Sequence, residues 1–231
     1  MTSASPIVQR LAPENLDEAV DVFADAFADY PVMRFTVGND DDVAARERRL
    51  VRLFVTRRVR RGGPLLGVRD RDGSLVAAAV LTLPVEPEPP PDLAQIAADA
   101  WRDLGDAARL RYDAYAAAAS FFGALPPHHH LNMIGVRRAH AGTGLGRVLL
   151  DAVRTMAAED SSSAGVSLTT ENPRNVELYR HVGFEVIGHR VVGEYQRDGQ
   201  ATTLETWGMF AAHGARASNS ASEPAKSKRT C

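Results

Sequence analysis

The stretch that decides the fold is LNMIGVRRAHAGTGLGRVLL, residues 131–150. It passes from a short apolar segment, Leu131 to Val136, to three glycines on alternate positions, Gly142, Gly144 and Gly146, and then into an apolar pattern of helical spacing. Glycines let the backbone N–H groups of a loop point in one direction, and the following helix adds unpaired N–H groups and the positive end of its dipole. The stretch therefore predicts a strand, an anion-binding loop and a helix.

Two phosphate-binding signatures do not fit the spacing of this loop. A Walker A loop places Lys and then Ser or Thr after its last glycine, whereas this chain has Arg147 and Val148. A dinucleotide-binding fingerprint spaces its glycines as G-x-G-x-x-G, whereas the spacing here is G-x-G-x-G. The loop therefore belongs to neither class.

Two motifs of the chain resemble those of the GNAT N-acetyltransferases. The family's loop reads Val-x-Pro-x-x-(Arg or Gln)-x-x-Gly-x-Gly, and its second motif reads Asn-x-x-Ala-x-x-x-Tyr-x-x-x-Gly-Phe. Together they are a specific signal, and the resemblance extends over about residues 5–211. The matching positions are Val136, Arg138, Ala141, Gly144 and Gly146 in the loop, and Asn172, Asn175, Tyr179, Gly183 and Phe184 in the second motif.

One further segment narrows the resemblance, and three positions depart from it. PHHHLNMIGV, residues 127–136, resembles the puromycin acetyltransferase branch of the superfamily. Ala141 replaces the usual Arg or Gln, Arg138 replaces the usual Pro, and Asn175 stands where Ala is common. Phosphate binding is therefore expected to rest on backbone N–H groups, with Arg147 or Arg138 supplying charge.

The resemblance implies that acetyl-CoA is the cosubstrate. Its pantetheine arm would pair with the backbone of the strand before the loop, where the fourth and fifth strands separate, and its pyrophosphate would bind the loop. A backbone N–H near Ile134 would polarise the thioester carbonyl. The residues expected to bind acetyl-CoA are Met133, Ile134, Gly135, Val136, Ala141, Gly142, Thr143, Gly144, Leu145, Gly146, Arg147, Asn172 and Asn175.

The resemblance also places Tyr179 at the position of the general acid, where its phenol can donate a proton to the departing thiolate. The attacking amine needs a base, because it is mostly protonated at neutral pH; the candidates are Glu171, His130, His128 or an ordered water, with Glu171 and His130 preferred. His128 and His130 share one face of a strand and His129 faces away, which argues against a three-histidine metal cluster. No metal is expected.

Three functions stay open at this point. The leading one is transfer of an acetyl group to a primary amine of a small molecule, an antibiotic or a metabolite, by direct attack in a ternary complex. The second is acetylation of a protein or peptide amine. The third is a sensor that binds CoA without turnover, which Ala141 and Arg138 favour and which Tyr179 and Asn172 oppose.

Composition and charge exclude several other classes. The 231 residues are 45% hydrophobic and 24% charged, enough for one domain with a full core. The net charge of -2 argues against nucleic-acid binding, although eight arginines lie between Arg46 and Arg61. Cys231 is the only cysteine, and the sequence shows neither a signal peptide nor a membrane-spanning run. We expect a cytoplasmic monomer or homodimer without nucleic-acid or membrane partners.

The apolar and turn patterns predict a single α/β domain of the α+β type over residues 1–211, with the GNAT fold implied by the resemblance. A mixed sheet of about six or seven strands would carry a parallel pair at its centre and helices on both faces. A helical insertion, residues 84–126, would lie between the third and fourth strands beside the acceptor pocket, and residues 212–231 would form a disordered tail. The expected strands are 7–11, 64–68, 75–83, 131–136, 166–170, 184–196 and 202–210, and the expected helices are 15–29, 41–60, 93–104, 110–122, 144–158 and 173–183.

The first helix carries three local predictions. Asn15 and Glu18 form an expected capping box, and Pro31 is expected to end the helix. Tyr30 would then lie in a loop and, together with His128, contact the acceptor. The exposed face of this helix is either simply solvated or a cation-attracting wall near the amine site, and it consists of Asp17, Asp21 and Asp25.

Overall fold

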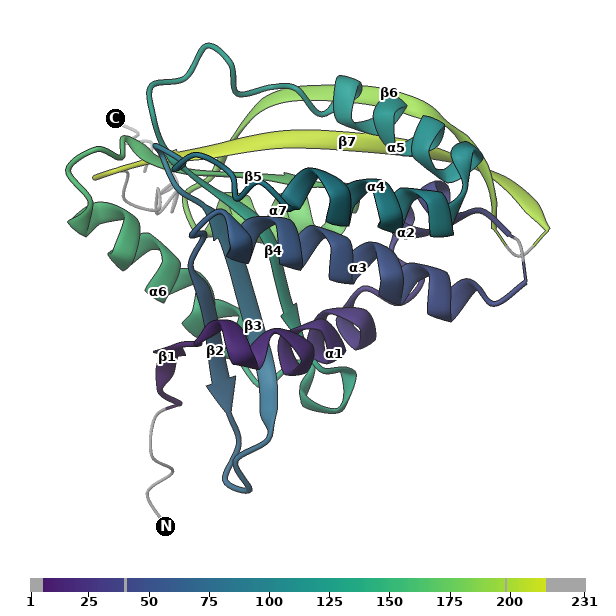
Figure 1. Ribbon diagram of the computed structural model, residues 1–231. Helices are drawn as coiled ribbons and strands as arrows, with labels where there is room; N and C mark the ends of the chain where they lie inside the picture. Colours follow the sequence, from purple (N-terminus) through teal and green to yellow (C-terminus); the bar gives the residue numbers. More distant parts are fainter. Residues whose placement is uncertain (1–5, 40, 198, 215–231) are drawn as a thin grey trace, which may run out of the picture.

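Seven strands form one mixed sheet in the computed structural model (Figure 1), which describes residues 6–39, 41–197 and 199–214. The strands are β1 (Val8–Arg10), β2 (Leu65–Arg69), β3 (Leu75–Thr82), β4 (His129–Val136), β5 (Gly165–Thr170), β6 (Glu185–Arg197) and β7 (Gln200–Ala212). They lie in the order β1-β2-β3-β4-β5-β7-β6, and β4 and β5 are the one parallel pair among these strands. The predicted parallel pair at the centre of the sheet is confirmed.

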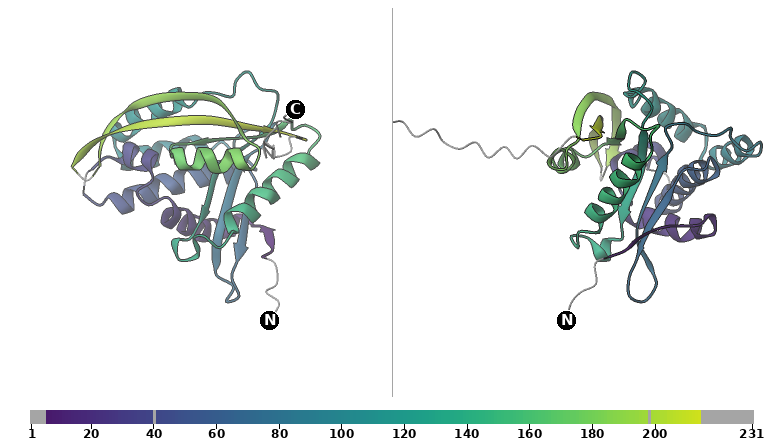
Figure 2. Two further views of the ribbon diagram at one scale, coloured as in Figure 1. Left: turned by 180° about the vertical axis from the view of Figure 1, so that it is seen from behind. Right: turned by 90° about the vertical axis from the view of Figure 1, so that its left-hand side faces the viewer.

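Helices cover both faces of the sheet, as predicted. α6 (Leu145–Glu159) and α7 (Pro173–His181) lie on the face of the sheet that is turned to the viewer in the left view of Figure 2. α1 (Leu16–Ala26) and α3 (Val43–Arg60) lie on the opposite face. Two helices stand between β3 and β4, where the insertion was expected. The remaining elements are α2 (Pro31–Val37), α4 (Leu93–Leu104), α5 (Asp106–Ala118) and the 3-10 helices η1 (Pro13–Asn15) and η2 (Arg138–His140).

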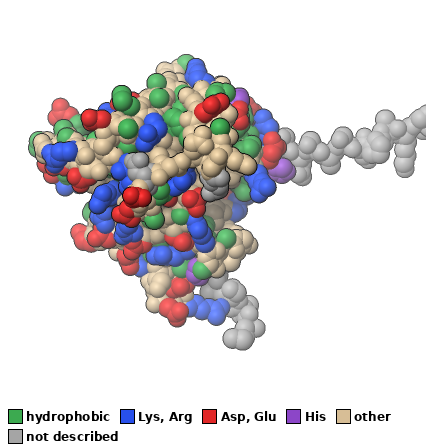
Figure 3. Space-filling view, turned by 90° about the vertical axis from the view of Figure 1, so that its right-hand side faces the viewer, with side chains coloured by type: hydrophobic (Ala, Val, Ile, Leu, Met, Phe, Trp, Pro, Cys, Tyr) green, Lys and Arg blue, Asp and Glu red, His purple; other side chains and the backbone are tan. Residues whose placement is uncertain are grey.

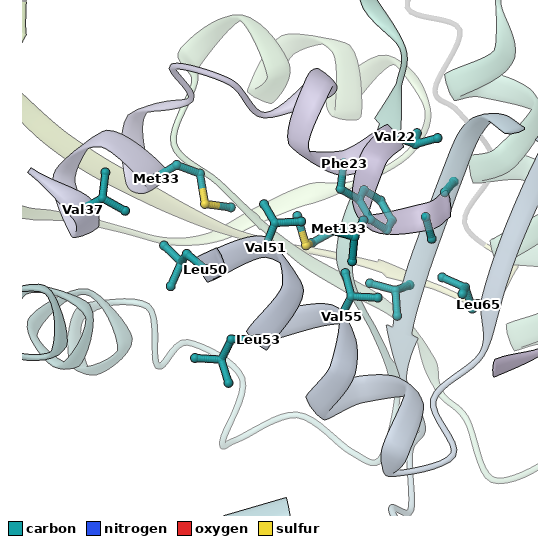
Figure 4. Packing of buried hydrophobic residues seen from close by; sticks show 14 of the residues in the cluster. Val22, Phe23, Met33, Val37, Leu50, Val51, Leu53, Val55, Leu65 and Met133 are labelled. Carbon is teal, nitrogen blue, oxygen red and sulfur yellow. The ribbon is translucent and has the colours of Figure 1, made fainter. Parts of the chain in front are cut away.

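Two apolar clusters hold these helices against the sheet. One joins α1, α3 and α4 to β3 and β4 and contains the buried side chains of Phe23, Leu50 and Met133 (Figure 4). The other packs α6 and α7 against the opposite face and contains Leu149 and Leu168. Full burial of a side chain of this kind contributes about 1.5–3 kcal/mol. The clusters therefore fix the positions of β4, β5 and α7.

Strand β4 carries a bulge halfway along its length. Leu131 pairs with Leu81 of β3 and Met133 pairs with Val80, so that Asn132 is an extra residue without a partner in β3. The bulge reverses the alternation of side chains between the two faces. Leu131 belongs to the cluster under α6, whereas Met133, two residues later, belongs to the cluster under α1 and α3.

Strands β4 and β5 separate beyond the bulge. Their pairing runs from His129 opposite Val166 to Leu131 opposite Leu168, and no described residue of β5 pairs with residues 132–136. β5 continues instead along β7. The edge of β4 that faces this gap is left with backbone groups that can pair with another extended chain.

Three local predictions on the helices are wrong. Pro31 does not end a helix; it is the first residue of α2, a position that suits proline because the first turn leaves its N–H groups unpaired. Asn15 precedes α1, but its side chain does not cap it, since its Oδ1 accepts from the N–H of Ala12 and its Nδ2 donates to Glu18. The helix expected at 110–122 is α5, which begins and ends four residues earlier.

The last two strands form a long hairpin beside the insertion. The ring of Phe121, after α5, packs where Gly188 and Gly208 have no side chain; a Cβ at these positions would lie 2.3 and 2.4 Å from the ring. The end of the insertion is thereby held against the hairpin. The predicted tail begins within ordered structure, because β7 reaches Ala212 and the N–H of His213 donates to the carbonyl of Ala164 at 3.1 Å. Residues 215–231 of that tail lie outside the described residues.

Two of the three aspartates on the acidic face of α1 are paired with arginines of α3. Asp21 forms an ion pair with Arg48, and Asp17 lies 2.6 Å from Arg52. Asp25 accepts from a backbone N–H at 2.7 Å and forms no ion pair with a described residue, so it is the one charge of this face that no cation compensates. Figure 3 shows acidic and basic side chains intermixed over the face that it presents. None of the described helices is both long and apolar enough to cross a bilayer.

Candidate active site

The gap between β4 and β5 borders a cavity of about 620 Å³. The diverging strands form part of its wall, and α1, α2, α3, α5, α7 and the loops around them supply most of the rest. α5 belongs to the predicted insertion, which therefore does lie beside the site. The polar and aromatic side chains in the wall include Tyr30, Phe54, Arg58, Glu86, Tyr112, Tyr115, Phe122, His128, His130, Glu171, Asn175 and Tyr179.

Glu171 directly follows β5 and is buried in this wall, with 7% of its surface exposed. The hydroxyl of Tyr115 donates to its Oε1 at 2.8 Å, and the hydroxyl of Thr206 donates to the same oxygen at 3.1 Å. Burial disfavours the charged form and raises the pKa of Glu171 to about 7. A carboxyl group with this pKa can accept and release a proton near neutral pH.

Two tyrosines hold the end of β5 and the carboxyl group of Glu171 in place. The Tyr30 hydroxyl lies 3.0 Å from Thr170 Oγ1 and accepts from the backbone N–H of Glu171 at 3.2 Å. The Tyr115 hydroxyl also lies 3.3 Å from Thr169 Oγ1. Burial raises the pKa of both phenols, so they stay protonated. Tyr30 lies in the loop between α1 and α2, as predicted, and lines the cavity.

Tyr179 lines the same cavity from α7. Its ring packs against Phe184, with the ring centroids 5.6 Å apart. Burial and, secondarily, the negative charge of Glu171 raise the pKa of Tyr179 to about 12. The phenol is therefore protonated at neutral pH and donates readily only to a strong base. The influence of Glu171 on this pKa places the two groups within electrostatic reach of each other.

The three consecutive histidines divide between two faces of β4, as expected. His128 and His130 line the cavity, and His128 Nδ1 lies 2.7 Å from the carbonyl oxygen of Pro126. His129 is buried on the other face, with its Nδ1 3.0 Å from Ser163 Oγ. In the part of the chain that the structure describes, no three His, Cys, Asp or Glu side chains are grouped as a metal site requires.

His130 is a weaker base than Glu171. Its Nδ1 lies 2.8 Å from Ser167 Oγ. Burial and, secondarily, the positive charge of Arg58 lower the pKa of His130 to about 3. The imidazole is therefore neutral at pH 7 and holds an added proton poorly, whereas the pKa of Glu171 matches neutral pH.

The glycine loop presents unused backbone donors at the start of α6. Gly142 and Gly144 have φ angles of 76° and 84°, and a Cβ at either position would meet no atom within 4 Å. The backbone N–H groups of Gly142, Gly144, Leu145 and Gly146 donate no hydrogen bond to any described residue. Four donors at the positive end of a helix dipole suit an anion, and the pyrophosphate of CoA fits this donor set.

One of the two arginines that were expected to supply charge to this loop is ion-paired. Arg147 Nε donates to both carboxylate oxygens of Asp151 at 2.9 Å. Arg138 Nη2 donates to the carbonyl of Ala28 at 2.9 Å, which engages one N–H group but leaves the positive charge uncompensated. Ala141 is exposed and offers no polar group. The loop therefore offers an anion its backbone N–H groups, with the charge of Arg138 four residues before Gly142.

The two asparagines of the second motif take different places. Asn172 caps α7, because its Oδ1 accepts from the N–H of Arg174 at 3.0 Å, and Pro173 follows at the first helical position. Asn175 lines the cavity.

Sequence reasoning missed Thr206 and Arg58. Thr206 reaches Glu171 only because β7 pairs with β5, and no residue spacing in the sequence predicts that contact. Arg58 was one of eight arginines on a basic helix. It follows the apolar residue Phe54 by four positions, however, and this spacing puts the two on one side of the helix. That spacing was the available signal.

Residues 94–204, just under half of the chain, match the family model of the acetyltransferase (GNAT) domain. The chain is similar to a histone acetyltransferase HPA2 and related acetyltransferase from Corynebacterium glutamicum, at a TM-score of 0.59 and 23% identity over 90% of this chain and 97% of the other. It is also similar to the ribosomal-protein-S18-alanine N-acetyltransferase of Escherichia coli (TM-score 0.53, 15% identity, 93% and 97% covered). A third is a phosphinothricin acetyltransferase from Sinorhizobium meliloti in complex with AcCoA (0.53, 14%, 90% and 89%). At these identities the structures show a shared fold.

Proposed function

We propose that this chain, of which residues 94–204 match the family model of the acetyltransferase (GNAT) domain, transfers the acetyl group of acetyl-CoA to a primary amine of a small molecule. One arrangement carries the proposal. The unpaired edge of β4 borders the cavity that holds Glu171 and Tyr179, and the chain passes from β4 into the glycine loop with its free N–H groups. A donor with a pyrophosphate and an extended diamide arm matches that sequence of contacts.

The chain's own groups suit the two ends of the donor. The loop from Ala141 to Arg147 would hold the pyrophosphate through its backbone N–H groups, and residues 133–136 would pair with the amides of the pantetheine arm. Asn175, in the cavity wall, is placed to contact the same arm. The N–H of Ile134 would face the thioester carbonyl and stabilise the negative charge that develops on its oxygen.

The reaction removes two protons from the ammonium nitrogen of the acceptor and supplies one to the departing thiolate, so one proton is released overall. Glu171 accepts a proton from the ammonium of the acceptor, and Oε2 is the oxygen for this task because Tyr115 and Thr206 both bind Oε1. The amine nitrogen then attacks the carbonyl carbon, so that a C–N bond forms and the C–S bond breaks. Tyr179 gives its proton to the departing sulfur, and the excess proton on the new amide passes to solvent.

The shape of the site favours a small acceptor. The cavity volume of about 620 Å³ lies in the range of small-molecule sites. Tyr112 and Tyr115 of α5 form part of its wall, so the insertion limits the space over the reacting groups. The segment 127–136, which resembles the puromycin acetyltransferase branch, is also part of this wall. A protein or peptide amine is the alternative acceptor.

The test is a thiol-release assay with acetyl-CoA and a panel of primary amines, run beside calorimetry of acetyl-CoA binding. Free thiol should appear with small amines, and peptides with free N-termini or lysines should react more slowly. Faster reaction with peptides would indicate that the acceptor is a protein or peptide amine. Tight binding of acetyl-CoA without thiol release from any amine would indicate a sensor instead.

Gly144→Asp should weaken the binding of acetyl-CoA at least about tenfold, because a carboxylate would stand beside the donors that hold the pyrophosphate. Calorimetry measures the change in Kd. Gly73→Asp is the matched control: Gly73 has a φ of 82° and open space around its Cβ direction, but it lies in the turn between β2 and β3. Equal Kd values for the two variants would mean that the phosphates bind elsewhere.

A further inference from the structure

Arg58 is a cation in the cavity wall whose guanidinium forms no hydrogen bond or salt bridge with any described residue. Arg60 of the same helix is paired with Asp92 at 2.6 Å. Arg49 and Arg57 also lack an ion pair among the described residues, but they do not line the cavity. Burial lowers the pKa of Arg58, which means that its charge is poorly solvated. A poorly solvated charge without a partner costs free energy, and a bound anion would recover it.

Glu86 is the acidic side chain of the wall that attracts Arg58, and its charge is shared. Glu86 Oε2 accepts from Arg61 at 3.1 Å, so one carboxylate serves two guanidinium groups and one positive charge is left over. The neighbouring His130 is neutral and cannot offset that charge, because its pKa is lowered to about 3. This part of the cavity therefore has a net positive charge.

Aromatic side chains line the same cavity as Arg58. Phe54 and Tyr112 lie with their ring centroids 5.1 Å apart, and Phe122 and His130 lie at the same distance. All four line the cavity. An apolar or aromatic spacer is the kind of group that such a wall accommodates.

Arg58 and Glu171 occupy different parts of the cavity wall. Arg58 comes one turn after Phe54 on α3, and the ring of Phe54 lies 5.1 Å from that of Tyr112 on α5. Glu171 is bound instead by Tyr115, whose ring lies a further 6.2 Å from that of Tyr112. Two ring-to-ring steps of this kind put the cation and the carboxyl group on the order of 10 Å apart. Glu171 would receive the amine, and Arg58 would receive a group of opposite charge.

We propose that the acceptor is a primary amine that also carries an anionic group, a carboxylate or a phosphate, at the far end of an apolar spacer, and that Arg58 binds this anion. The inference rests on the proposed function, since it defines the substrate class of the same site. Arg58 positions the acceptor so that its amine reaches Glu171. Amines without an anionic group leave Arg58 unpaired and are poor substrates.

The test compares amines that differ only in the far group. The panel contains the terminal amino derivatives of butanoate, hexanoate and octanoate, aminomethylbenzoate, the carboxamide of each, and aminohexyl phosphate. The wild type should prefer an anion over its matched carboxamide by at least about tenfold in kcat/KM, the order expected for a charge-assisted hydrogen bond. The phosphate compound tells which anion is preferred.

Variants of Arg58 assign the preference to this side chain. Arg58→Gln should remove the preference, chiefly through a higher KM for the anions, and Arg58→Lys should keep part of it. Arg57→Gln is the matched control, because Arg57 is the adjacent arginine and does not line the cavity. The melting temperature of Arg58→Gln should be equal to or higher than that of the wild type, since an unpaired charge is removed. A lower one would indicate a structural role.

Calorimetry of each amine in the presence of CoA tests the same preference by binding alone, without turnover. The proposal is overturned if carboxamides bind and react as well as anions, if Arg58→Gln keeps the preference, or if no anionic amine binds. Failure of the proposed function looks different. In that case anions would bind in an Arg58-dependent manner, but no amine would become acetylated.

Discussion

Replacing Tyr179 by Phe should lower kcat by about a hundredfold, the lower end of what a general acid contributes. The substitution removes one hydroxyl from a ring that packs against Phe184, so the fold and the wall of the cavity should be preserved. Without the phenol, the departing thiolate must take its proton from water. The measurement is the rate of thiol release at saturating acetyl-CoA and acceptor.

Affinity separates this role from a binding role. The Kd for acetyl-CoA should change less than about threefold in Tyr179→Phe, because the phenol acts on the departing sulfur rather than on the bound donor. An acetyl donor with a better leaving group should lessen the defect, and an acetyl thioester of an aromatic thiol provides one. Unchanged kcat in the variant would remove Tyr179 from the reaction.

Replacing Glu171 by Gln should have the largest effect, a loss of about a thousandfold in kcat/KM. The amide keeps the shape of the side chain and can still accept from Tyr115 and Thr206, but it cannot take up a proton. His130 should not replace it, since its pKa of about 3 makes it a poor proton acceptor. His130→Gln, the matched control, should lower kcat/KM far less.

The pH profile should report Glu171 directly. Only the carboxylate accepts a proton, so kcat/KM of the wild type should rise as the pH increases through about 7, the pKa of Glu171. The profile is measured with an acceptor whose own amine titrates well away from pH 7. The rise of kcat/KM near pH 7 should be absent from the residual activity of Glu171→Gln. If the variant still shows this rise, another group is responsible for it.

The same pKa has a consequence for stability. A carboxyl whose pKa is raised on folding stabilises the native state most below its unfolded pKa of about 4.3, and this contribution is lost as the pH rises through about 7. Glu171→Gln removes the cost of charging the buried group. Its melting temperature relative to the wild type should therefore be higher at pH 8 than at pH 5.

The sequence allowed the donor side of the site to be predicted in detail. The glycine spacing around Gly144 and the distance from Asn172 to Tyr179 are set within short segments, and such segments fold into the same loop and helix start wherever they occur. The free N–H groups of the loop and the capping by Asn172 depend on local geometry alone. Local motifs are therefore the part of the site that can be predicted from a single sequence.

The acceptor side could not be predicted to the same degree. Thr206 and Tyr115 reach Glu171 from β7 and α5, and their sequence separations of 35 and 56 residues give no periodic signal. Tyr30 was identified for the wrong reason, because Pro31 opens a helix instead of ending one. Contacts of this kind arise when distant elements pack together, and single-sequence patterns do not encode them.

The bulge in β4 also could not be predicted from the sequence. Regular alternation assigns Leu131 and Met133 to one face, whereas the extra residue Asn132 places them on opposite faces. The bulge lies where β4 begins to diverge from β5, next to the cavity. A bulge is a feature of the pairing between two strands, so the sequence of either strand alone does not predict it.

The most direct test of the central claim follows an acetyl group with a carbon-13 label from acetyl-CoA to its product. The proposed direct transfer predicts one labelled acetyl amide per thiol released, no label on the protein, and loss of both products in Glu171→Gln. Mass spectrometry of the amine and of the intact protein measures both. Label attached to the protein would contradict direct attack, and thiol release without an acetylated amine would contradict the transferase itself.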